Sequence, residues 1–293
     1  MLLRTFAAFS ELSPAHLAIL AELAEERFFP AGAELHPENV PVRDVHYLLS
    51  GEVEIRRHGR AMRRLGPRSV VGGLAALAGK RDAYQVVALA DTTTFSFTHE
   101  DQVEVFEDNF EMMTGVLRGV AGAYLDARRG AGEAAGFAED DDPGGMPAQP
   151  LGLVGKLAVL RRAAPLSEAQ IEALAELARE SPERRIAAGT VLWRAGEPSG
   201  SALLVVAGVI EGTSGEQRFR LGAGSIAGGL DSIAERPRWF DAIAATDLTA
   251  LEIPLGALYD VLEDHSDMAM DLLRGMARGV LALRESSALA AQP

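Results

Sequence analysis

Residue types that commonly carry catalysis or hold metal ions are sparse in this sequence. It contains no cysteine, which excludes disulfides and thiolate metal sites and fits a reducing compartment. Its six histidines show none of the spacings that are typical of metal ligands. We therefore expect no metal site, no catalytic residue and no enzyme activity.

Two glycine pairs recur along the chain. Gly72-Gly73-Leu74 is matched 156 residues later by Gly228-Gly229-Leu230. Each pair favours a tight turn with positive φ, whether or not a ligand binds there. Arg238 follows the second pair, and Asp241 lies three residues further on, so Arg238 could bind an anionic ligand or form a local ion pair.

The glycine pairs belong to a repeat that covers most of the chain. Residues 47–55, 72–77 and 86–91 have counterparts at 204–210, 228–233 and 242–247. An internal repeat of this size in a chain of 293 residues indicates two copies of one domain. We assign the first domain to 1–129, an acidic linker rich in glycine and proline to 130–150, and the second domain to 151–293.

Each copy has the same order of predicted elements. Leading helices come first, and in copy one Ser13 is a predicted N-cap with Pro14 at the first helical position. Short runs that alternate apolar and polar residues follow at 30–97 and at 188–253, which is typical of half-buried strands. Closing helices are predicted at 99–129 and 255–285. The predicted fold is mainly β with flanking helices, as two antiparallel jelly-roll barrels in tandem.

Charge and hydropathy limit the partners. The net charge is −14, with 42 acidic and 28 basic residues, and pairs such as Arg161-Arg162 do not extend into a long basic cluster. Nucleic-acid binders usually carry a basic patch, so we expect no nucleic-acid partner. No apolar run approaches the roughly 20 residues of a membrane helix, so we expect no membrane partner and a cytoplasmic location.

Each copy resembles the cyclic nucleotide-binding domain of bacterial regulators, kinase regulatory subunits and channels. The resemblance rests on leading helices that end in Leu-Ser, on the strand motif around Gly51, on the turn at Gly72 that enters a short helix, and on Ala88-x-x-Asp91. It implies a phosphate cassette, approximately Gly-Glu-Leu-Ala followed by Arg-x-Ala-Thr. In that cassette, backbone N–H groups and the arginine hold the cyclic phosphate, and the glutamate accepts from the ribose 2′-hydroxyl.

This sequence departs from the cassette at its anchor positions. The glutamate position holds Gly73 and Gly229, and the arginine position holds Asp82 in copy one and Arg238 in copy two. Arg81 is adjacent but out of register by one residue, which in a strand places it on the other face. Each lost charged hydrogen bond costs about 1.5–3 kcal/mol. The candidate ligand-binding residues of these degenerate cassettes are Gly72, Gly73, Leu74, Arg81, Gln85, Gly228, Gly229, Leu230, Arg238 and Asp241.

Three function hypotheses remain. The first is a non-enzymatic regulatory protein whose output passes through a protein partner, or through self-association by the closing helices. The second is a cyclic nucleotide sensor that binds its ligand in the second domain through Arg238. The third is an enzyme on a related jelly roll such as a cupin, which is the weakest because His46 stands alone in its predicted strand. We expect no tightly bound cofactor. We also expect no DNA-binding domain, because few residues follow Glu285.

Overall fold

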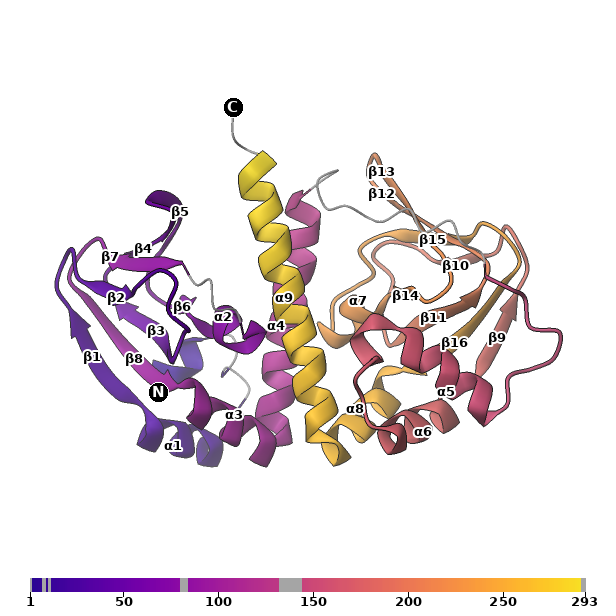
Figure 1. The fold of residues 1–293 in the computed structure, drawn as a ribbon, viewed down its shortest axis with the longest axis horizontal. Coiled ribbons are helices and arrows are strands. Elements are labelled where there is room, and N and C mark those ends of the chain that lie inside the picture. The colour runs from indigo at the N-terminus through magenta and orange to yellow at the C-terminus, as the bar shows by residue number, and fades with distance from the viewer. Residues whose placement is uncertain (1, 7–8, 10–11, 80–83, 132–143, 291–293) are drawn as a thin grey trace. The chain divides into compact units, whose positions relative to one another are not determined.

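The chain forms two compact units. The computed structural model describes residues 2–6, 9, 12–79, 84–131 and 144–290. Unit 1 comprises residues 1–119 and 277–293, and unit 2 comprises residues 120–276. Figure 1 shows each unit as a set of strands accompanied by helices. Most of the acidic linker predicted at 130–150 lies outside the described residues, so the linker remains a prediction.

Unit 1 contains two four-stranded antiparallel sheets, in the orders β1-β8-β3-β6 and β2-β7-β4-β5. Apolar side chains of both sheets, among them Leu48, Val53, Val71 and Val86, form the core between them. The strands are β1 (Glu25–Phe29), β2 (Glu34–His36), β3 (Asp44–Ser50), β4 (Val53–Arg57), β5 (Arg60–Leu65), β6 (Val70–Val71), β7 (Gln85–Ala88) and β8 (Thr92–Thr98).

Two helices of unit 1 pack against the first of these sheets, α2 against β3 and α3 against β8. Ser13 caps α1 by accepting a hydrogen bond from the His16 backbone N–H at 3.3 Å, as the sequence predicts. Tyr47 of β3 packs its ring against those of Phe6, Phe9 and Phe97, at centroid distances of 5.1, 4.9 and 5.3 Å. The elements are η1 (Leu2–Thr5), α1 (Pro14–Leu23), α2 (Gly73–Ala78), α3 (His99–Asp108), the start of α4 (Phe110–Ala131) and the end of α9 (Ser266–Ala290).

Unit 2 repeats this sheet topology strand for strand. Its sheets have the orders β9-β16-β11-β14 and β10-β15-β12-β13, and all pairings are antiparallel. Two β barrels with the same strand order confirm the predicted fold class. The strands are β9 (Glu183–Ile186), β10 (Val191–Trp193), β11 (Ser201–Ala207), β12 (Ile210–Ser214), β13 (Gln217–Leu221), β14 (Ile226–Ala227), β15 (Asp241–Ala244) and β16 (Leu248–Pro254).

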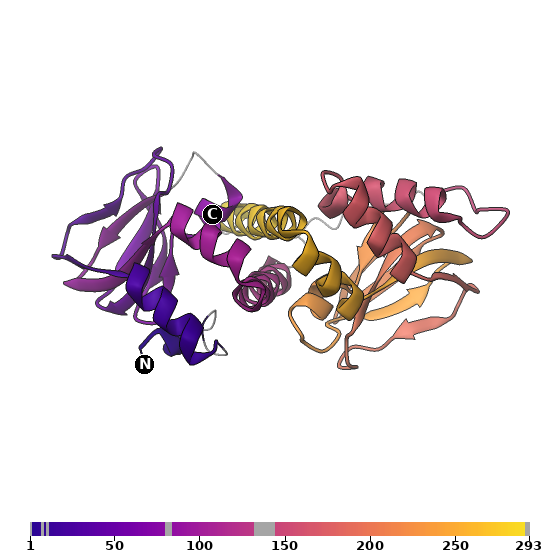
Figure 2. The ribbon, with the colours of Figure 1, turned by 90° about the horizontal axis from the view of Figure 1, so that it is seen from below.

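The helices of unit 2 gather on one side of its strands, as Figures 1 and 2 show for α5, α6 and α8. Helix α6 has the clearest amphipathic pattern, since Ala173, Leu174, Leu177 and Ala178 are buried while Glu172 and Glu180 are exposed. The helices are α5 (Leu153–Arg162), η4 (Ala164–Leu166), α6 (Ile171–Glu180), α7 (Gly229–Ile233) and α8 (Leu255–Asp264), with the end of α4 and the start of α9.

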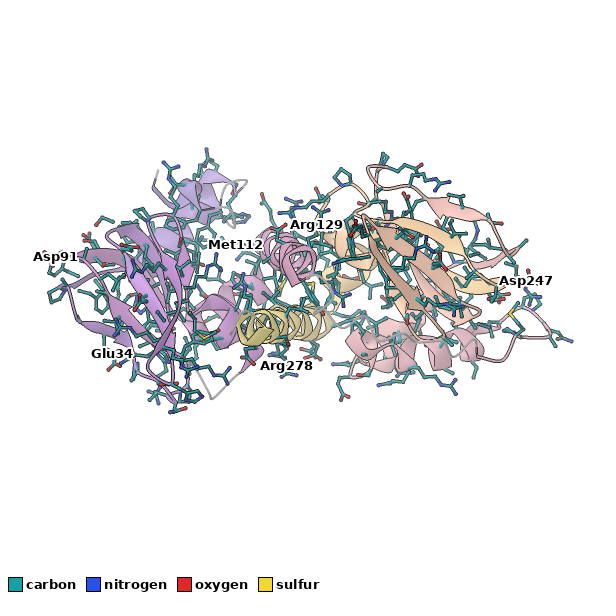
Figure 3. The ribbon with its side chains drawn as sticks, turned by 90° about the horizontal axis from the view of Figure 1, so that it is seen from above. Glu34, Asp91, Met112, Arg129, Asp247 and Arg278 are labelled. Carbon is teal, nitrogen blue, oxygen red and sulfur yellow. The ribbon has the colours of Figure 1, made fainter. Side chains whose placement is uncertain are left out.

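The two closing helices each end in the unit of the other repeat. Helix α4 begins in unit 1, but its residues from Val120 belong to unit 2; helix α9 begins in unit 2, but its residues from Ala277 belong to unit 1. Within unit 1, Arg278 Nε of α9 donates to the Ala78 carbonyl at the end of α2, at 3.1 Å. Within unit 2, Arg236 Nη1 donates to Asp126 Oδ1 of α4, at 2.7 Å. Figure 3 labels Arg278 and Arg129 on these exchanged helix ends.

The turn between β11 and β12 is tightly packed, and a comparison of two glycine substitutions can test this. Gly208 has φ +93°, and a Cβ there would collide with the Asp247 carbonyl, whereas Gly196 has φ +89° and open space. We expect Gly196→Ala to cost about 1–2 kcal/mol of unfolding free energy for its backbone conformation. Gly208→Ala should cost at least about 1 kcal/mol more, because the corner must also shift.

Urea unfolding followed by tryptophan fluorescence measures this difference, since both tryptophans of the chain, Trp193 and Trp239, lie in unit 2. Equal losses for the two alanine variants would contradict the expected packing at Gly208.

Candidate ligand sites at the glycine turns

The first glycine of each pair is required by its backbone conformation and its surroundings. Gly72 has φ +89° and Gly228 has φ +72°, and each directly precedes a short helix, α2 or α7. A Cβ at Gly72 would lie 2.9 Å from the Asp44 carbonyl oxygen, and a Cβ at Gly228 would collide with the Arg238 guanidinium. Gly73 and Gly229, which start the helices, are not left-handed. The predicted positive φ thus holds for one glycine of each pair.

In unit 1 the structure describes part of the predicted site. Gly73 and Leu74 form the start of α2. Gln85 lies on β7, where its Nε2 donates to Glu34 Oε1 of β2 at 2.7 Å. Arg81 and Asp82 lie outside the described residues. Gln85 stands where the cassette has its threonine or serine, and its side chain is therefore already engaged by a neighbouring strand.

In unit 2, Arg238 is buried beneath the glycine turn, with a relative exposure of 6%. Its Nη1 donates to the Gly228 carbonyl at 2.8 Å, and its Nη2 donates to the Ser201 carbonyl of β11 at 2.7 Å. The Ser232 hydroxyl lies 2.9 Å from each of these two carbonyl oxygens. The guanidinium carbon lies 4.3 Å from the centroid of the Trp193 ring. Arg238 thus joins the turn before α7 to strand β11.

Asp241 does not pair with Arg238. Its Oδ1 accepts a hydrogen bond from the Ala195 backbone N–H at 2.7 Å, and its Oδ2 lies 3.7 Å from Arg194 Nη1. The local ion pair considered for Arg238 and Asp241 is therefore absent. The reason is the strand geometry of β15 and the residues before it, because side chains three residues apart in an extended chain point to opposite faces.

The acid near Arg238 is instead Asp231 of α7, which the sequence reasoning missed. Asp231 has a relative exposure of 0%, and its Oδ2 lies 3.9 Å from Arg238 Nη1. Burial raises the pKa of Asp231 to about 6, opposed by Arg238, by the Trp239 backbone N–H and by Arg129. Burial also lowers the pKa of Arg238, which Asp231 partly offsets. The sequence did contain a sign of this residue, because Asp231 stands where the Gly-Glu-Leu-Ala motif has its alanine.

A cavity of about 610 Å³ opens beside this turn within unit 2. Gly228, Gly229 and Leu230 are among its lining residues, as are the aromatic residues Trp239 and Phe240. Tyr124 and Arg128 from the end of α4 also line it, whereas Arg238 does not. Sequence patterns could not reveal the α4 residues, because they belong to the closing helix of the other repeat.

The described residues contain no group of three or more His, Asp or Glu side chains that could hold a metal ion. His46 is buried on β3, where its Nδ1 lies 3.3 Å from Thr94 Oγ1 and burial lowers its pKa to about 4. Among the described helices, none is both long and apolar enough to cross a membrane.

Comparison with known proteins agrees with this architecture. The model of the cyclic nucleotide-binding domain family matches residues 26–109 and 183–265, which together make up more than half of the chain. The chain belongs to the cyclic nucleotide-binding domain family. Each match begins within the first strand of a barrel and ends after the helix that follows the last strand, and so confirms the tandem arrangement.

Individual relatives are distant. The regulatory domain of Toxoplasma gondii PKA with cAMP is 17% identical, covers 91% of this chain and 94% of its own, and has a TM-score of 0.34. The N-terminal domain of a transcriptional regulator from Streptomyces coelicolor A3(2) is 22% identical, covers 44% and 94%, and has a TM-score of 0.39. Glutaminase 2 of Bradyrhizobium diazoefficiens is 31% identical over 121 residues, 41% of this chain; the match spans only 19% of the glutaminase.

The raised pKa of Asp231 predicts a pH dependence of unit 2 stability. Between pH about 4 and about 6 the folded state retains a proton that the unfolded chain has released, so stability falls as the pH rises. The full effect of a shift from 3.8 to about 6 is about 3 kcal/mol. Between pH 4 and pH 7 the unfolding free energy of Asp231→Asn should therefore rise by about 3 kcal/mol relative to that of the wild type.

Urea unfolding at successive pH values, followed by tryptophan fluorescence, measures the difference. Asp260→Asn removes an exposed carboxylate from α8 and is the control for the change in net charge. If the Asp231→Asn curve ran parallel to the wild-type curve, Asp231 would not be the group responsible.

Proposed function

We propose that this protein is a non-enzymatic regulator whose two cyclic nucleotide-binding domains do not bind cyclic nucleotides tightly. Its output passes through contacts of the closing helices, with a protein partner or with a second copy of the chain. The observation that carries the proposal is the position of Arg238, whose two Nη atoms are bound to the Gly228 and Ser201 carbonyls.

Phosphate binding by Arg238 would be costly. The guanidinium would have to leave two buried carbonyls, and charged hydrogen bonds contribute about 1.5–3 kcal/mol each. The buried Asp231 carboxylate, 3.9 Å from the guanidinium, would repel a phosphate that approached it. At Gly229 there is no side chain to accept from a ribose hydroxyl. The lost carbonyl contacts, the repulsion by Asp231 and the missing acceptor at Gly229 together support a degenerate pocket in unit 2.

The exchanged helix ends support an output through the closing helices. In unit 2 the segment after α7 is bound to α4 through Arg236 and Asp126, and in unit 1 the end of α2 is bound to α9 through Arg278. A displacement of either short helix would therefore pull on a closing helix. Such a displacement could be driven by a partner that contacts these helices, with no bound nucleotide.

A cyclic nucleotide sensor that uses Arg238 is the second candidate. It is favoured by one observation, that the buried Nε of Arg238 has no hydrogen-bond partner among the described residues. An anion that reached the guanidinium would supply one. This candidate requires the turn at Gly228 to rearrange, because Arg238 lies outside the lining of the cavity.

Isothermal titration of the full chain with cyclic AMP and cyclic GMP separates the two candidates. We expect no binding tighter than a Kd of about 100 μM, because Arg238 is engaged and Asp231 repels the phosphate. Micromolar binding by the wild type that Arg238→Lys weakened tenfold or more would overturn the proposal. The lysine keeps the charge but loses the two-pronged geometry of the guanidinium.

The coupling between α4 and the segment after α7 can be tested at Gly122. A Cβ at Gly122 would lie 3.0 Å from Arg236 Nη2, so Gly122→Leu should push the guanidinium away from Asp126. We expect hydrogen exchange of residues 229–237 to become several-fold faster, as the contact with α4 is lost. Hydrogen–deuterium exchange with mass spectrometry on the full chain measures this.

Gly119→Leu is the matched control, because a Cβ at Gly119 on the same helix meets no atom within 4 Å. Unchanged exchange of residues 229–237 in Gly122→Leu would show that the Arg236 contact does not couple α4 to this segment.

A further inference from the structure

Three aromatic residues line one part of the cavity of unit 2, and we call them the aromatic wall. The rings of Phe219 and Trp239 are stacked, with an interplanar angle of 14° and a centroid distance of 5.6 Å. Phe240 meets both rings edge-on, at 5.0 Å from each centroid. All three residues line the cavity, whose volume lies within the roughly 300–1,000 Å³ of small-molecule pockets. A wall of this kind favours a planar, largely apolar molecule.

Two charged residues of opposite sign line the same cavity, Asp231 and Arg128. The Arg128 guanidinium carbon lies 5.2 Å from the centroid of the Tyr124 ring, which also lines the cavity. Arg238, the other nearby cation, is engaged with two carbonyls outside the lining. A carboxylate disfavours an anionic ligand and a guanidinium disfavours a cationic one, so the lining as a whole favours a molecule without net charge.

Asp231 strengthens the preference against anions. The residue is fully buried, and its carboxylate lies near the Arg238 guanidinium and the Trp239 backbone N–H. An anion in the cavity would be repelled by a carboxylate that water does not screen.

We propose that the unit 2 cavity binds an uncharged, planar aromatic molecule that has no phosphate. The inference rests on the proposed loss of phosphate binding and names the class of ligand that the site accepts instead. The ligand would lie between the aromatic wall and the end of α4, and so would link a small molecule to a closing helix.

Three probes of nearly one shape test the charge preference: benzamide is neutral, benzoate anionic and benzamidine cationic. Binding to the full chain is followed by tryptophan fluorescence, since both tryptophans lie in unit 2 and Trp239 lines the cavity. We expect benzamide to bind with a Kd of about 1 mM or tighter, and each charged probe at least tenfold more weakly. Equal or tighter binding of benzoate or benzamidine would overturn the proposal, and so would no detectable binding of benzamide.

Asp231→Asn tests the role of the carboxylate. The asparagine keeps the shape and an acceptor oxygen but removes the charge. We expect the affinity for benzoate to rise about tenfold while that for benzamide changes by less. An unchanged ratio of the two affinities would overturn the assignment of Asp231, and this ratio does not depend on small changes in stability.

Gly275→Leu tests whether benzamide binds in this cavity. Gly275 of α9 lines the cavity, and a Cβ there meets no atom within 4 Å, so a leucine can enter the space without a backbone clash. We expect benzamide binding to weaken at least tenfold. Gly119→Leu is the matched control, since Gly119 has equal space around its Cβ but lies in unit 1. Wild-type affinity in Gly275→Leu would place the binding site elsewhere and overturn the proposal.

The two proposals fail in different ways. Tight binding of cyclic AMP would overturn the proposed function, whatever benzamide does. Absence of benzamide binding, with cyclic AMP also not bound, would overturn only the inference about the cavity.

Discussion

A guanidinium removed from water must find acceptors inside the protein, and Arg238 finds two of them on the backbone of its own barrel. It binds the carbonyl of the glycine turn and that of Ser201 at the start of β11, and it packs on the Trp193 ring. Gly228 must remain a glycine, because any Cβ there would occupy the place of the guanidinium. The turn before α7 is thereby joined to β11, and the buried Asp231 of α7 lies 3.9 Å from the same guanidinium.

The two repeats share one strand order but differ at the residues that matter for ligands. Unit 1 has Gln85 bound to Glu34 on a neighbouring strand, whereas unit 2 has Asp241 bound to the Ala195 backbone. Strand pairing and core packing depend on patterns of apolar residues, which tolerate many substitutions. A charged site depends on single side chains. Duplicated domains can therefore keep one fold while their sites diverge.

The same distinction decides what the sequence could predict. Alternation and glycine spacing predicted the strands from β2 to β8 and from β10 to β16, but not β1 and β9, which lie before the predicted ranges of 30–97 and 188–253. The residues of β1, Glu25-Glu26-Arg27-Phe28-Phe29, do not alternate between polar and apolar, so this signal is missing there. The repeat was sufficient for the two barrels, because it can be read directly from the sequence. Alignment with the phosphate cassette also identified Arg238 as the residue at the arginine position. It did not reveal the partners of Arg238, since Ser201 lies 37 residues away in the chain. Strand alternation explains why Asp241 points away from Arg238. The part played by α4 was beyond prediction, because Arg236 and Asp126 are separated by 110 residues and form only an exposed ion pair.

The exchange of helix ends has a consequence for how such a gene can change. The last turns of the chain supply Arg278 and Glu285 to unit 1, where they meet Ala78 and Arg57. A truncation that removed residues after 276 would thus expose part of the first repeat, although the missing segment is encoded at the far end. Deletion of the second repeat would therefore remove contacts from the first. We expect such a chain to fold less stably than the complete pair of repeats.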